Sequence, residues 1–137
     1  MAFLITPPNL GHAGRRECMQ ARLNFQDDGA TFTFPALPAG TMLDAIHRSV
    51  NTTFDDSGAD DFIVGTAVDP DGFCILANTD LTTAGMYHDT GGVLVAANGM
   101  PQRLAAATAL TCVYNGANSD ATQGEVDVYV YYTLANA

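Results

Sequence analysis

Lysine and tryptophan are both absent from this chain of 137 residues, and glutamate occurs only twice. Glutamate and lysine are common on helix surfaces, whereas the thirteen aspartates are typical of turns and caps. This composition favours strands and turns over helices. No apolar run approaches the roughly 18 residues needed to span a bilayer. A chain of this length predicts one domain that folds without disulfides or metals.

Positive charge is also scarce, because five arginines stand against fifteen acidic residues and give a formal net charge of −10. The negative field repels phosphate backbones and anionic lipids, so we expect neither nucleic acid nor membrane as a partner. The N-terminus lacks the basic and apolar regions of a signal peptide, which predicts synthesis in the cytoplasm. The widely spaced Cys18, Cys74 and Cys112 are expected to be reduced thiols and not a disulfide framework.

The first 17 residues differ in composition from the rest. They contain an apolar triplet, two prolines, two glycines and a basic pair: Phe3, Leu4, Ile5, Pro7, Pro8, Gly11, Gly14, Arg15 and Arg16. Prolines favour an extended path and glycines disfavour a helix. We therefore expect an extended N-terminal arm over residues 1–17 and a β domain over residues 18–137.

Alternation of apolar and polar residues predicts about eight strands at the spacing of a β-sandwich or jelly-roll-like barrel. The expected strands are Met19–Phe25, Thr31–Phe34, Thr41–Phe54, Phe62–Val68, Phe73–Leu76, Val93–Ala97, Leu104–Tyr114 and Glu125–Leu134. In the third of these, Met42, Ile46 and Val50 also fit a helical spacing, but the β-branched residues near its end favour a strand.

The last two runs flank the polar loop 115–124, and this arrangement predicts an antiparallel hairpin. In the final run the valines share one face, and Tyr129 and Tyr131 share the other. Tyrosine is enriched at protein interfaces, so these two residues are candidates for a self-interface. Burial of this second face inside the domain is an equal alternative.

Residues that could carry chemistry do not form a recognisable motif. His12, His47 and His88 do not lie at metal-ligand spacing from one another or from a cysteine. Cys112 lies in an apolar run, which favours a buried filler. Asp69–Gly72 resembles the start of a calcium loop, but its glycine comes too early, and a turn is the better interpretation. The sequence therefore predicts no enzyme and no cofactor-binding or metal-binding residue.

Three segments carry a resemblance to a known group of proteins. They are Pro38-Ala39-Gly40-Thr41, the run Phe62-Ile63-Val64-Gly65-Thr66 with its following Asp69–Phe73 turn, and the strand Gly124–Tyr132. In this order they resemble the capsid decoration (cement) proteins of tailed bacteriophages and related small virion proteins. Asp44, His47 and Arg48 interrupt the apolar alternation where the resemblance leads one to expect a regular strand.

The resemblance implies a structural virion protein, often trimeric, that binds the outer capsid surface. It would contact the major capsid protein and bridge neighbouring subunits against internal DNA pressure. The arm would then supply the capsid-binding residues, which are Phe3, Leu4, Ile5, Pro7, Pro8, Arg15 and Arg16. Two alternatives are another neck, tail or baseplate component and a carbohydrate-binding host-attachment domain, although the latter usually stacks sugars on tryptophan.

Overall fold

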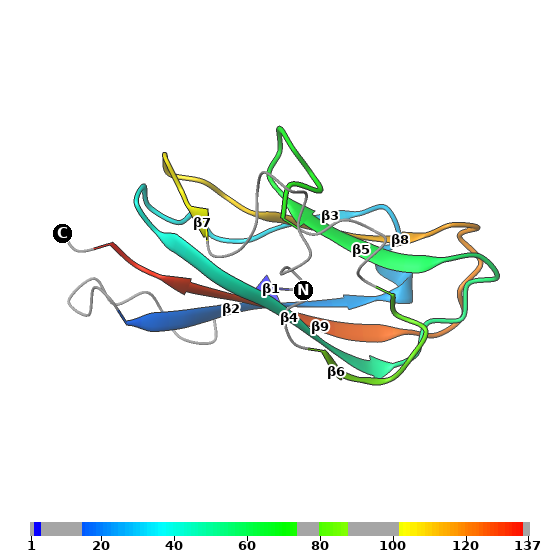
Figure 1. Cartoon of the computed structure of the whole chain (residues 1–137). Helices are drawn as coiled ribbons and strands as arrows, with labels where there is room; N and C mark the ends of the chain where they lie inside the picture. Colours follow the sequence, from blue (N-terminus) through cyan, green and yellow to red (C-terminus); the bar gives the residue numbers. More distant parts are fainter. Residues whose placement is uncertain (1, 4–14, 74–79, 88–101, 136–137) are drawn as a thin grey trace.

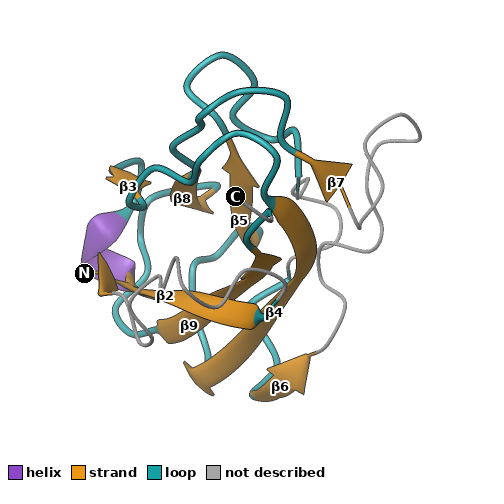
Figure 2. Cartoon of the chain, turned by 90° about the vertical axis from the view of Figure 1, so that its left-hand side faces the viewer, coloured by secondary structure: helices purple, strands orange, loops and turns teal. Residues whose placement is uncertain are grey.

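The computed structural model describes residues 2–3, 15–73, 80–87 and 102–135, and they form two antiparallel β-sheets (Figure 1). The larger sheet contains β1 (Ala2–Phe3), β2 (Arg16–Asn24), β4 (Met42–Thr52), β6 (Gly85–Tyr87), β7 (Gln102–Arg103) and β9 (Glu125–Thr133). The smaller sheet contains β3 (Thr31–Thr33), β5 (Asp60–Gly65) and β8 (Thr111–Gly116). In Figure 2, β3, β8 and β5 form the upper layer and β2, β9 and β4 the lower one, so the expected all-β antiparallel sandwich is confirmed.

Strand β9 lies at the centre of the larger sheet, whose order is β1-β2-β9-β4-β6 with β7 also paired to β4. The alternation of its residues explains this position. Its core-facing side chains are fully buried, namely Val126, Val128, Val130 and Tyr132. A strand with neighbours on both sides and one apolar face is stabilised by burial along its whole length. The predicted run Glu125–Leu134 is therefore confirmed almost to the residue.

Strand β4 confirms the choice of strand over helix, but its faces differ from those expected. Leu43, Ile46 and Val50 point into the core, whereas the even spacing from Met42 predicted that Met42 would do so. A register shift between Leu43 and Ala45 explains the difference, because one extra residue at a β-bulge switches the faces of all residues before it. The bulge also accounts for Asp44, which interrupts the apolar alternation.

The predicted hairpin between the last two long strands is wrong. Strand β8 pairs with β3 and β5 in the smaller sheet, whereas β9 pairs with β2 and β4 in the larger one. Both strands bury an apolar face, and the intervening loop is long enough to cross the roughly 10 Å between packed sheets. At its end Gly124 has a φ of 146°, and an added Cβ would lie 2.3 Å from Cδ2 of Phe54, so only glycine fits there.

Other boundaries shift for local reasons. Residues 104–110 precede β8 as irregular chain with one isolated bridge, between Leu37 and Thr108. Strand β5 ends at Gly65, because residues 66–72 turn back and the amide of Thr66 donates to the carbonyl of Asp69 at 2.9 Å. The loop projects from the smaller sheet in Figure 1. The expected strands Phe73–Leu76 and Val93–Ala97 lie largely or wholly outside the described residues.

The N-terminal boundary also differs slightly from the expected one at Cys18. Strand β2 begins at Arg16, and β1 pairs with it antiparallel, with Ala2 opposite Ala21. The start of the expected arm therefore adds a short strand to the edge of the sheet. A two-residue strand has no periodicity in sequence, which is why β1 was not predicted.

The core lies between the two sheets. Large side chains that are at most 3% exposed come from both layers and from the loops: Met19, Leu23, Phe34, Leu37, Leu43, Ile46, Phe54, Phe62, Leu81, Leu110, Tyr114 and Tyr132. Cys112 is fully buried among them, as expected for a filler, while Cys18 is partly exposed.

Candidate interaction surfaces

The outer face of the larger sheet consists of the side chains of β2, β9 and β4 that point away from the core. Tyr129 and Tyr131 lie on this face and are half-buried. Burial raises the pKa of both phenols above the usual range. Both side chains therefore lie outside the sandwich core, on a surface that a partner could contact.

Tyr131 is held between charged and aromatic neighbours. The ring of His47 lies 5.0 Å from the Tyr131 ring, measured between centroids. The guanidinium carbon of Arg16 lies 5.2 Å from the Tyr131 ring centroid, within the range of a cation–π contact. Cys18 stands opposite Tyr131 in the register, and burial raises the pKa of its thiol. We call Arg16, Cys18, His47, Tyr129 and Tyr131 the tyrosine patch.

An ion pair borders the tyrosine patch on the same face. The Nε and Nη2 of Arg22 donate to the two carboxylate oxygens of Asp127 at 2.8 and 3.0 Å. Asn51 donates to Asp127 at 3.0 Å and to Glu125 at 3.1 Å. Burial acts to raise the pKa of Asp127, but hydrogen bonds from Arg22, Asn51 and Gln20 outweigh it, so the pKa is lowered. This network fixes the side chains of three adjacent strands.

The residues expected in the arm are only partly described. Leu4, Ile5, Pro7 and Pro8 lie outside the described residues, and the backbone of Phe3 pairs with Gln20. The Nε of Arg15 lies 3.9 Å from Oε1 of Glu17, and the Nε of Arg16 lies 3.7 Å from Oδ2 of Asp44. The side chains of Arg15 and Arg16 are 58% and 57% exposed, so both remain accessible to a partner.

Aspartates gather where the loop 53–59 meets the loop 117–124. Asp56 accepts hydrogen bonds from the amides of Gly58, Asn118 and Asp120 at 2.7 to 3.1 Å. Burial acts to raise the pKa of Asp56, but these amide donors outweigh it and lower the pKa. Asp55 accepts hydrogen bonds from both the amide and the hydroxyl of Thr122, and these two bonds lower the pKa of Asp55.

These carboxylates therefore fasten two loops together. Aspartates in turns are commonly solvated, but Asp56 is only 8% exposed. Sequence reasoning missed the network because its members lie more than 60 residues apart. The glycine and asparagine residues of both loops were the available signal, since they supply accessible amides.

A buried acid lies beneath these loops. Asp60 is 1% exposed and accepts a hydrogen bond of 2.5 Å from the hydroxyl of Tyr114. Burial raises the pKa of Asp60, and burial together with the Asp60 contact raises the pKa of Tyr114. The pair is enclosed by the chain and contributes to the core and not to a surface.

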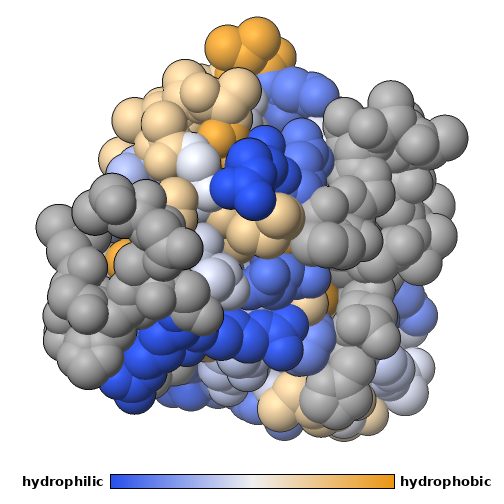
Figure 3. All heavy atoms as spheres, turned by 60° about the vertical axis from the view of Figure 1, so that its left-hand side comes forward, coloured by the Kyte–Doolittle hydropathy of each residue, from blue (hydrophilic) through white to orange (hydrophobic). Residues whose placement is uncertain are grey.

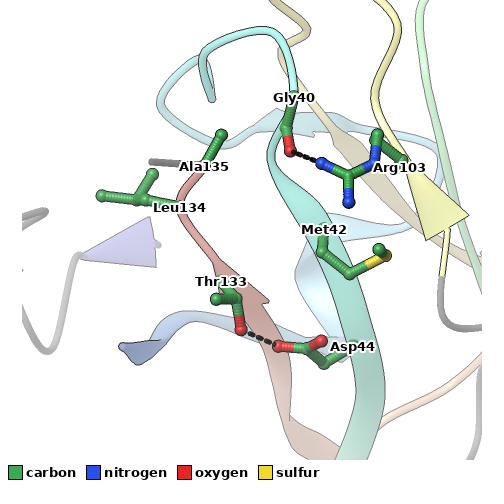
Figure 4. A pocket seen from close by; sticks show the side chains of 7 residues that line it. All are labelled: Gly40, Met42, Asp44, Arg103, Thr133, Leu134 and Ala135. Atoms are coloured by element: carbon green, nitrogen blue, oxygen red, sulfur yellow. Dashed lines mark hydrogen bonds between the residues drawn. The ribbon is translucent and has the colours of Figure 1, made fainter. Parts of the chain in front are cut away.

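A shallow pocket of about 550 Å³ opens at the end of the sandwich where β4 begins (Figure 4). It is lined by Gly40, Met42, Asp44, Arg103, Thr133, Leu134 and Ala135. Its polar side chains are engaged within the chain, because Thr133 donates to Asp44 at 2.6 Å and Arg103 donates to the carbonyl of Gly40 at 3.0 Å. This side of the molecule, seen in Figure 3, mixes hydrophilic areas with smaller hydrophobic ones.

Within the described ranges, no group of three or more histidine, cysteine, aspartate or glutamate side chains is placed to hold a metal ion. Among the same residues, none of the helices has the length and apolar character needed to cross a bilayer.

Comparison with known proteins yields matches at the level of fold. No protein-family model and no curated protein matches the chain. The fold is that of an antiparallel β-sandwich found in solved structures of bacteriophage capsids.

Two such structures match over nearly the whole chain. A chain of the cyanophage Pam1 capsid asymmetric unit has a TM-score of 0.65 at 15% identity, covering 95% of this chain and 92% of its own length. A chain of the acidic stable capsid structure of Helicobacter pylori bacteriophage KHP30 has a TM-score of 0.63 at 12% identity, covering 90% of both chains. Because both matches cover most of both chains, these neighbours are chains of about the same length as this one.

Proposed function

We propose that the protein is a structural virion component that binds the outer surface of a phage capsid and bridges neighbouring subunits of the major capsid protein. The observation that carries this proposal is the similarity, over at least nine tenths of the chain, to chains in two phage capsid structures. Those neighbours are as small as this chain, which favours an accessory protein that is added to a shell. The role is one of binding and not of catalysis.

The charge of the chain supports an outer position. A net charge of −10 would be repelled by packaged DNA on the inner side of a shell. Accessible Arg15 and Arg16 can pair with acidic groups of a capsid subunit. Tyr129 and Tyr131 of the tyrosine patch are aromatic side chains on the outer sheet face, and we propose these two residues as the contact between copies in a homotrimer.

The first experiment counts the protein in purified phage particles. We expect a fixed ratio of copies to the major capsid protein, in the tens to hundreds per particle, measured by quantitative mass spectrometry. Electron cryomicroscopy of the same particles should place the sandwich on the outside of the shell. About a dozen copies at one vertex would instead indicate a neck or tail component, and an absence from the particle would contradict the proposal.

The second experiment tests the arm. Deleting residues 1–14 leaves β2 intact, because that strand begins at Arg16. We expect the truncated protein to keep its thermal unfolding midpoint within a few degrees and to bind shells lacking the protein at least tenfold more weakly. Arg103→Ala serves as a control variant away from the arm, because Arg103 is exposed at the opposite edge of the sheet. Undiminished binding of the truncated protein would exclude residues 1–14 as the clamp and leave only Arg15 and Arg16 of the expected arm.

A further inference from the structure

Strand β3 (Thr31–Thr33) lies at an edge of the smaller sheet, with β8 as its neighbour in the order β3-β8-β5. Figure 2 shows β3 at the side of the upper layer, next to the 3-10 helix η2 (Phe25–Asp27) that connects it to β2. The side chains of Thr31 and Thr33 are exposed, and Phe32 is half-buried against the core. Among the described strands, none pairs with the other side of β3, and we call this side the open edge.

The register determines which backbone groups face that edge. The amide of Phe34 donates to the carbonyl of Leu110, so residues 34 and 110 form a hydrogen-bonded pair. Hydrogen-bonded and non-hydrogen-bonded pairs alternate along an antiparallel ladder. Phe32 therefore bonds to β8, whereas the N–H and C=O groups of Thr31 and Thr33 point outward.

A small crevice lined by both apolar and polar residues lies directly beside the open edge. It has a volume of about 210 Å³ and is lined by Leu23, Asp27, Ala30, Thr31 and Phe32. Leu23 belongs to the core and is 1% exposed, so the crevice leads into the seam between the two sheets. An open strand edge next to a side-chain pocket is the arrangement by which proteins bind an extended peptide as an added strand.

The charge around the crevice indicates which side chains a bound segment would carry. Its lining contains one acid, Asp27, and the neighbouring Asp28 is also acidic, with no basic residue in the lining. An apolar side chain flanked by a lysine or arginine would match both the crevice and its rim. The arm of a second copy fits less well, because its apolar triplet lies ten residues before Arg15 and its Phe3 already pairs with β2.

We propose that the edge of β3 binds an extended segment of a neighbouring capsid subunit, which adds a strand to the smaller sheet and places one apolar side chain in the crevice. A basic residue of that segment faces Asp27 and Asp28. This inference rests on the proposed capsid-binding function and names the partner and the geometry of one contact.

Thr33→Pro tests the proposal, because it removes an outward N–H and leaves the bonds between β3 and β8 in place. Proline is tolerated on an edge strand when its nitrogen faces solvent, and the preceding Phe32 is already extended. Thr33→Val is the matched control, since it changes the side chain and keeps the N–H. We expect Thr33→Val to bind capsid shells like the wild type and Thr33→Pro to bind at least tenfold more weakly, with unchanged circular dichroism.

Hydrogen exchange on the wild-type protein gives a second measurement that does not depend on any variant. Mass spectrometry of a peptide covering residues 30–34 should show slower exchange when the protein is bound to shells than when it is free. Among the described residues, no backbone carbonyl accepts from the amides of Thr31 and Thr33, so we expect both amides to exchange quickly in the unbound protein.

The outcomes separate this inference from the proposed function. If the wild type does not bind shells, both fail. If the wild type binds and Thr33→Pro binds equally, or residues 30–34 gain no protection, the β3 contact is wrong and capsid binding stands. If Thr33→Pro lowers the mass of a self-assembled species in solution and leaves shell binding unchanged, the occupant is a second copy, which also overturns the proposal.

Discussion

Two core tyrosines differ in how their hydroxyl groups are satisfied. Tyr114 donates to Asp60 at 2.5 Å, whereas the hydroxyl of Tyr132 is buried and has no hydrogen-bond partner in the part of the chain that is described. Both rings are fully buried. An unsatisfied buried hydroxyl costs free energy, whereas loss of one partner from a buried pair costs more, because the other partner is left unpaired.

We therefore predict opposite effects for the same substitution at these two positions. Tyr132→Phe should leave the free energy of unfolding unchanged or raise it by up to about 1 kcal/mol. Tyr114→Phe should lower it by about 1 to 3 kcal/mol, because Asp60 loses its hydroxyl donor. Urea unfolding followed by circular dichroism measures both. Equal losses for the two variants would show that Tyr132 has a partner, such as a buried water.

The ionisation of Asp127, on the outer face of the larger sheet, contributes to the pH dependence of the stability of the fold. Its pKa is lowered in the folded protein, so its ionised form stabilises the fold above the unfolded pKa of about 3.9. That contribution is lost as the pH falls through the lower folded pKa. Asp60 acts in the opposite direction, because its raised pKa makes its protonated form favourable to the fold.

Asp127→Asn should therefore reduce the loss of stability between pH 5 and pH 2. At pH 7 the variant should be less stable by about 1 to 2 kcal/mol, because the bidentate contact with the half-exposed Arg22 is lost. Unfolding free energies measured across this range for both proteins give the comparison. Parallel pH profiles for wild type and variant would exclude Asp127 as a contributor.

At the scale of elements, the aspartates of the loop 53–59 hold the loop 117–124 in place. This contact sets the path by which the chain crosses from β8 in one sheet to β9 in the other. Asp120 completes the connection by accepting the amide and hydroxyl of Ser57 at 2.8 and 2.6 Å.

Asp56→Ala should loosen both loops together. Three amides lose their acceptor, so hydrogen exchange in residues 117–123 should become faster and the thermal midpoint should fall. Asp71→Asn is the control, because Asp71 is an exposed acid in the projecting loop after β5. Faster exchange confined to residues 53–59 would show that Asp56 does not connect the two loops.

Alternation along the chain was sufficient to predict the long strands. Val126, Val128 and Val130 mark β9 because each must face the core, and the same holds for Met19 and Leu23 of β2. Alternation does not identify the neighbour of a strand, since β8 would show the same pattern in a hairpin or in a separate sheet. The bulge at Asp44 escaped prediction for a similar reason, because it depends on pairing with Thr133 and Tyr132.

The candidate surfaces were predicted less completely than the fold. Tyr129 and Tyr131 were identified from the polar face of their strand, and both lie on the outer face of the larger sheet. The rest of the tyrosine patch comes from β2 and β4, so Arg16 and His47 join it only through sheet order. The crevice beside β3 combines Leu23 with Ala30 and Phe32 across a connection whose path the sequence does not specify.

At the scale of the whole molecule, the excess of ten negative charges acts against the compact state through self-repulsion. Raising the salt concentration from about 0.01 M to 0.5 M shortens the screening length several-fold and weakens this repulsion. We expect the thermal midpoint at pH 7 to rise by a few degrees over this range. Sodium chloride is the appropriate salt, since sulfate would stabilise through exclusion as well. A fall in the midpoint would show that the ion pairs outweigh the repulsion.

The central position of β9 determines the order in which the protein can form. Arg22 and Asp127, which pair across β2 and β9, are 105 residues apart in sequence. At a synthesis rate of about 5 to 20 residues per second, β2 waits roughly 5 to 20 seconds on the ribosome before its main partner exists. During that time β2 and β4 have no strand between them. The nascent chain therefore exposes unpaired strand edges and apolar side chains, which favour chaperone binding or aggregation.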